Sequence, residues 1–151
     1  MSRLALLGLL ALAAACAPLP PASPDAVAKA RLFTPTPSRA RLYVLCKSSG
    51  SRVFPVVLNG RLIGGLSWGT YLMVEIPPGT YTLQSHTEES LARLEFEAEP
   101  ERVYYVELYR RRGVWDLLGF FEARVALRQV DEIEGRKAVA ERRLVESEAG
   151  R

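Results

Sequence analysis

Two cysteines and a single histidine are the residues of this chain best suited to metal or nucleophilic chemistry. His86 lies in a polar stretch beside Glu88 and Glu89. A zinc site needs three or four ligands, and the usual His and Cys spacings of such sites are absent. Cys46 lies in an alternating apolar segment, where a cysteine behaves as a small hydrophobe. We therefore predict no metal, cofactor or catalytic residues, with His86 on a surface loop and Cys46 in the core.

The sequence carries no motif of a known nucleotide-binding site, because P-loop and dinucleotide fingerprints are missing. The segment Gly65-Leu66-Ser67-Trp68-Gly69 matches the spacing Gly-x-Ser-x-Gly of hydrolases. The glycines at 60, 64, 65 and 69 have the spacing of turns, and the glutamate pairs at 88/89 and 95/97 are typical of solvated surfaces. Because no nucleophile–base pair is visible, we predict that the protein is not an enzyme.

Three consecutive arginines, Arg110, Arg111 and Arg112, precede Trp115 on a predicted loop. Such a loop could contact anionic lipid or a glycan. The alternative, which we favour, is a charged hairpin end whose tryptophan covers the edge of the fold.

Aromatic residues suggest a second possible surface. Trp68, Tyr71 and Trp115 would form a binding face for a small ligand or a glycan if the fold placed them together on one concave surface. Substituting them would then abolish binding without unfolding the domain.

Residues 1–15 have the pattern of an export signal. Arg3 is followed by the apolar run Leu4–Ala15, which is too short to span a bilayer as a helix. The run ends at Cys16 and resembles a bacterial lipobox, in which the cysteine becomes the lipidated first residue of the mature chain. An ordinary signal peptide cut after Ala-x-Ala is the alternative. By the same resemblance, Ala17 after the cysteine suggests the outer membrane.

Residues 16–38 are predicted to be a linker, because six prolines lie at positions 18, 20, 21, 24, 35 and 37. Proline-rich chains favour an extended polyproline geometry of about 3 Å per residue. Such a spacer would hold a domain several nanometres from the membrane. A short helix over Asp25–Phe33, capped by Asp25, is the alternative.

Residues 39–130 alternate apolar and polar side chains, as antiparallel sheets with one wet face do. Asn59-Gly60 has the composition of a type I′ hairpin turn, and Pro77-Pro78-Gly79 marks another turn. Short strands with frequent turns predict an all-β, antiparallel β-sandwich, with a small open barrel as the alternative. The expected strands are Arg41–Cys46, Val53–Leu58, Arg61–Gly64, Tyr71–Ile76, Thr80–Gln84, Leu91–Ala98, Arg102–Arg110 and Gly119–Gln129.

A C-terminal helix is predicted over residues 131–146, followed by a tail at 147–151. Asp131 and Glu134 have the spacing of a capping box. Gly135 weakens the helix by about 1 kcal/mol relative to Ala. A narrow apolar stripe is expected at Ile133, Lys137, Ala140 and Leu144, which would either pack on the sandwich or bind a partner.

Several segments together resemble a bacterial family known as domain of unknown function 2846, whose members are short exported proteins and often lipoproteins. They are Ala40–Val44, Leu58–Gly64, Gly69–Tyr71, Glu75–Leu83, Val103–Val106 and Val130–Gly135. The central part is also similar to the PEGA repeat of bacterial surface proteins. The resemblance implies a transthyretin-like or immunoglobulin-like sandwich and no activity.

Charge argues against nucleic acid as a partner. The chain has 20 basic and 17 acidic residues, and removing Arg3 with the signal leaves 19 against 17, or +2. We therefore predict a non-catalytic lipoprotein of the cell envelope, anchored through Cys16. It would present loops and sheet edges to an envelope protein or polymer, as a structural or protein-interaction module. Small-ligand or glycan binding is the alternative.

Overall fold

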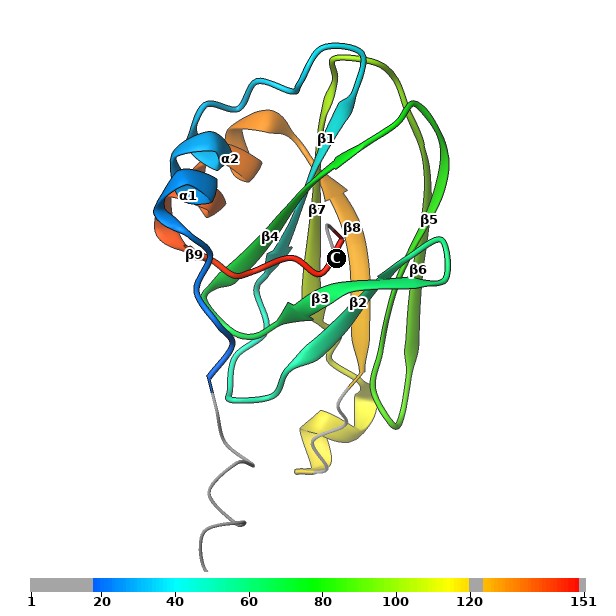
Figure 1. The fold of residues 1–151 in the computed structure, drawn as a ribbon. Helices are drawn as coiled ribbons and strands as arrows, with labels where there is room; N and C mark the ends of the chain where they lie inside the picture. The colour runs from blue at the N-terminus through cyan, green and yellow to red at the C-terminus, as the bar shows by residue number, and fades with distance from the viewer. Residues whose placement is uncertain (1–17, 120–123, 150–151) are drawn as a thin grey trace, which may run out of the picture.

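A computed structural model describes residues 18–119 and 124–149, without the side chains of Trp115 and Leu117. Two sheets pack face to face (Figure 1). The first sheet has the order β8 (Val125–Val130), β7 (Val103–Arg110), β1 (Ala40–Cys46), β4 (Thr70–Ile76) and β9 (Arg143–Leu144). The second has the order β3 (Arg61–Leu66), β2 (Phe54–Leu58), β5 (Gly79–His86) and β6 (Leu91–Ala98). The predicted sandwich is confirmed, and the described strands do not close into a barrel.

The two predicted turns join these strands. Asn59 and Gly60 have φ angles of 48° and 79°, as a type I′ hairpin between β2 and β3 requires. The Asn59 side chain also accepts a hydrogen bond of 2.7 Å from the Thr82 N–H of β5. Gly79, at φ 147°, begins β5 after the Pro77-Pro78 corner. Local turn chemistry therefore fixes the register of the second sheet.

One central pairing differs from the antiparallel prediction. Strands β1 and β7 run parallel, with Arg41 opposite Val103 and Cys46 opposite Leu108. The chain passes through the whole second sheet between these two strands and re-enters the first sheet from the same end. Parallel pairing needs such a long crossover. It places Lys47, just after β1, beside the end of β7, where the Lys47 N–H donates 2.8 Å to the Leu108 carbonyl.

The first sheet is buried on both faces over much of its area, so the expectation of one wet face is wrong for it. Its inner face forms the core between the sheets, which includes Cys46 as predicted. Its outer face lies under two helices, α1 (Pro24–Arg31) and α2 (Glu132–Glu141) (Figure 1). All seven residues of β1 are buried for this reason. Among the described residues, no helix is long and apolar enough to cross a membrane.

The predicted spacer over residues 16–38 is wrong for the part that the structure describes. Helix α1 forms there, capped by Ser23 rather than Asp25. It packs Ala26 and Val27 on the sheet, and Ala30 is fully buried. Arg41 donates 2.9 Å to the Lys29 carbonyl, and the Tyr43 hydroxyl donates to the Ala30 carbonyl. The prolines lie before the helix, at its first residue and after its end, where they interrupt no helical hydrogen bond.

The predicted C-terminal helix is present but ends at Glu141, because Arg142 is extended and leads into β9. Asp131 caps it as predicted, accepting 2.8 Å from the Glu134 N–H. The expected apolar stripe is wrong, since Ile133 is 83% exposed. The helix instead faces the sheet with Gly135, Ala138 and Val139. A small-residue face was missed because Gly135 was interpreted only as a weakness.

Two sheet edges are covered by the ends of the chain. The Glu148 N–H donates 2.9 Å to the Ile63 carbonyl of edge strand β3. Beside edge strand β9, the Ala22 N–H donates 3.3 Å to the Leu144 carbonyl. Covered edges have few free backbone groups for another chain. The predicted presentation of sheet edges to a partner therefore does not apply to β3 and β9.

Candidate functional site

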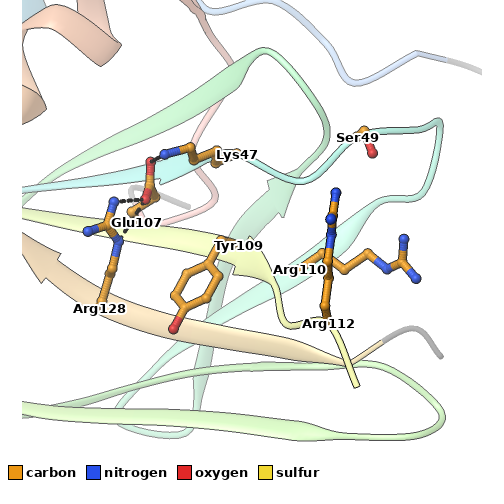
Figure 2. A pocket seen from close by; sticks show the side chains of 7 residues that line it. All are labelled: Lys47, Ser49, Glu107, Tyr109, Arg110, Arg112 and Arg128. Carbon is orange, nitrogen blue, oxygen red and sulfur yellow. Dashed lines mark hydrogen bonds and ion pairs between the residues drawn. The ribbon is translucent and has the colours of Figure 1, made fainter. Parts of the chain in front are cut away.

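The part of the first sheet's outer face that the helices leave open forms a groove of about 440 Å³. We call it the basic groove. Figure 2 shows its lining side chains, which come from the loop after β1, from the end of β7 and from β8. They are Lys47, Ser49, Glu107, Tyr109, Arg110, Arg112 and Arg128.

Glu107 is the central anion of the basic groove and is only 2% exposed. It accepts hydrogen bonds from Arg128 at 2.9 and 2.6 Å. The Lys47 ammonium and the Arg142 guanidinium lie 3.9 and 3.7 Å from its other oxygen. The hydrogen bond to Glu107 raises the pKa of Arg128, so this guanidinium stays charged. Three cations surround this buried carboxylate, and Arg128 also contacts the Glu134 carboxylate at 2.6 Å, so the cluster holds three cations and two carboxylates.

The predicted arginine loop forms the outer rim of the groove. Arg110 binds Asp116 at 2.8 Å, and the Asp116 carboxylate also accepts 3.0 Å from the Gly113 N–H. This closes a tight turn into the short 3-10 helix η1 (Val114–Leu118). Arg111 is held by its backbone N–H, which donates 2.9 Å to the Arg124 carbonyl. The side chains of Arg111 and Arg112 are exposed.

The predicted aromatic surface is not assembled. Trp68 is 67% exposed in the turn between β3 and β4, whereas Tyr71 is 2% exposed. Tyr71 lies in the core under the helices, with its ring centroid 6.2 Å from that of Tyr43. The sequence predicts Tyr71 at a surface because the outer face of β4 is expected to be exposed to solvent. The side chain of Trp115 and the whole of Cys16 lie outside the described residues.

The residues most suited to catalysis lie apart. His86 is exposed as predicted, but it is the last residue of strand β5 and not part of a loop. Cys46 is fully buried, and burial raises the pKa of its thiol, so the reactive thiolate is disfavoured. Within residues 18–119 and 124–149, no group of three or more His, Cys, Asp or Glu side chains is placed to hold a metal ion.

Sequence reasoning missed Lys47, Ser49, Tyr109, Glu107 and Arg128 as parts of one site. A signal was present for the last two. Glu107 is the one acid in β7, where the other residues from Val103 to Tyr109 are apolar or aromatic, and it stands directly opposite Arg128 in the β7–β8 pair. Opposite charges at such positions stabilise each other across a sheet. The lysine could not be found this way, because its place depends on the parallel β1–β7 pairing.

No family model matches the chain. The chain is similar to a protein of Haemophilus influenzae that is described as uncharacterized. The two are 25% identical over 142 residues, which are 92% of this chain and 81% of the relative. The likeness covers most of the chain and names no activity.

Proposed function

We propose that this protein is a bacterial lipoprotein of the cell envelope, similar to the members of the family known as domain of unknown function 2846. Lipid on Cys16 would anchor it, in the outer membrane and facing the periplasm. The sandwich would act as a non-catalytic structural or interaction module. Stable anchoring needs more than one acyl chain, since each buried CH₂ contributes about 0.8 kcal/mol. A lipoprotein with several chains meets this requirement.

The observation that carries the proposal is the apolar run Leu4–Ala15 that ends at Cys16, and the structure adds that the chain is bound to the domain from Leu19 onward. The Glu146 N–H donates 3.1 Å to the Pro20 carbonyl, and Arg143 donates 3.4 Å to the Leu19 carbonyl. Only three residue steps separate Cys16 from Leu19, and an extended chain covers at most about 10 Å in three steps. A lipid on Cys16 would therefore hold the domain against the membrane, not at the end of a spacer.

The surface features support a module that binds without catalysis. Cys46 is enclosed in the core and His86 is exposed at a strand end, so they make no nucleophile–base pair. Because the edges of β3 and β9 are covered, an envelope protein or polymer would meet other surfaces, which include the loops, the edges of β6 and β8 and the open outer face of the first sheet. The lining of the basic groove has four cations and one acid, which favours an acidic partner.

Intact mass and membrane fractionation in the native host test the proposal. The wild-type chain should begin at Cys16, carry three acyl chains and sediment with the membranes. Cys16→Ser should release it into the soluble fraction. Cys46→Ser is the matched control, and it should stay in the membrane because this thiol lies in the core. An unlipidated, soluble wild-type chain cut near Ala15 would contradict the proposal.

A further inference from the structure

We propose that the end of the sandwich next to Leu19 binds the anionic headgroups of a bilayer. We call this surface the basic end. It combines exposed cations with exposed apolar side chains, and its members are Lys47, Arg52, Val53, Arg111, Arg112, Val114 and Leu118. The inference rests on the proposed function, because lipid on Cys16 is what would bring this end to the membrane.

The contacts of the fold connect the N-terminal segment to this end. A Cβ built on Gly65 would lie 3.3 Å from the Leu19 side chain and 2.8 Å from that of Val53. From Val53, the loop over residues 47–53 leads back to Lys47, which is bonded to the end of β7. The arginines and η1 follow that strand end. Figure 1 shows the first described residues leaving the molecule at the same end as η1.

The charge of the basic end is available to a ligand. In the described part of the chain, the side chains of Arg52, Arg111 and Arg112 have no acidic partner within ion-pair distance. Lys47 is 57% exposed, while its own acid, Glu107, is buried beneath it. Each lysine or arginine held near an anionic leaflet adds to membrane affinity, and salt weakens the effect.

Apolar side chains stand among these cations. Val114 is 77% exposed, Leu118 64% and Val53 48%. A surface with basic residues around apolar tips is the composition that proteins use to lie on a bilayer, because the tips enter the headgroup boundary. Exposed apolar side chains in water have no such benefit. The combination favours a bilayer over a soluble anion as the ligand.

The acidic residues near the basic end determine how the domain would be oriented on a bilayer. Asp116 is neutralised by Arg110. Glu88 and Glu89 lie in the β5–β6 turn, which is on the far side of the same end from the N-terminal segment (Figure 1). Anionic lipid would repel that turn. The domain would therefore approach the bilayer with the first sheet nearer to it than the second.

Vesicle sedimentation tests the inference with a Cys16→Ser chain that starts at residue 16 and keeps every described residue. We expect it to bind vesicles rich in phosphatidylglycerol, to bind pure phosphatidylcholine weakly, and to be released by salt. Arg111→Gln with Arg112→Gln should weaken binding about 25-fold, from about fivefold per arginine. The matched control, Arg102→Gln with Lys137→Gln, removes two exposed cations elsewhere and should bind like the parent chain.

Three outcomes would overturn the inference. They are equal binding to both kinds of vesicle, equal loss in both double variants, and binding of inorganic phosphate without binding of vesicles. Thermal unfolding of each variant shows that a loss of binding is not a loss of fold. The assay uses a chain without lipid, so its failure would leave the mass and fractionation result standing. Failure of that result would equally leave the vesicle result unchanged.

Discussion

Three buried tyrosines tie the helices to the first sheet at the residue level. The rings of Tyr43 and Tyr105 stack with centroids 5.1 Å apart, and Tyr71 packs against the same cluster. Burial is the largest cause that raises the pKa of each of these phenols above 10.0. A buried phenol resists losing its proton because the phenolate would have no water around it.

The raised pKa values of these three tyrosines predict that the protein loses stability at alkaline pH. Above about pH 10 the unfolded chain releases these phenolic protons while the folded chain retains them. The folded state then binds more protons, so the free energy of unfolding falls as pH rises through the raised pKa values. Below pH 10 the contribution is fully present. Urea unfolding between neutral pH and about pH 11 measures the slope. Tyr71→Phe should make it shallower, and an unchanged slope would contradict the assignment.

Some residue roles were predictable because their causes are local in the chain. Asn59 and Gly60 need only their own φ angles, and Asp131 needs only an N–H three residues on. Glu107 was not predictable as the centre of a site. Its partners Lys47 and Arg142 come from distant segments that meet only through the long crossover and the strand after α2.

Helix α2 shows how packing can reverse a propensity argument. An alanine Cβ at Gly135 would lie 2.2 Å from the Tyr105 ring, which is far inside contact distance. The glycine that weakens the isolated helix is therefore what lets the helix approach the sheet. Apolar periodicity missed this, because a face of Gly and Ala carries little hydrophobic signal.

Gly135→Ala should therefore destabilise the protein. The gain in helix propensity is about 1 kcal/mol, and overpacking against a rigid ring costs about 1 to 3 kcal/mol. We expect a net loss of about 1 kcal/mol, measured by urea unfolding. Lys137→Ala, on the exposed side of the same helix, should change stability by less than about 0.5 kcal/mol. A Gly135→Ala protein as stable as the parent would show that the helix can move away from the sheet.

The strands were largely predictable and their surroundings were not. Alternation identified the inner faces of β1, β4 and β6, where Leu72 and Phe96 point into the core. It could not show that helices cover the outer face of the first sheet. The helix α1 was obscured by its prolines, although Ala26, Val27 and Ala30 form a small apolar face three and four residues apart.

At the scale of the whole molecule, the first and last described segments of the chain meet on one side of the sandwich. Residues 20–22 pair with residues 144–146, and Val145 is also part of the core between the sheets. Residues 20–22 are therefore held against the domain by hydrogen bonds and do not form the expected spacer. We therefore propose that a lipid on Cys16 would hold the domain close to the bilayer with its basic end toward the membrane.

Energy transfer from the lipidated protein to headgroup-labelled lipids tests that claim most directly. A fluorophore is placed on a cysteine at Ser49, beside the basic end, or at Thr80, in β5 near the opposite end. Cys46 is buried and Cys16 would be acylated, so labelling would be confined to the new thiol. We predict efficient transfer from position 49 and much weaker transfer from position 80. Weak and equal transfer from both positions would contradict the account, because it would place the domain on a free spacer.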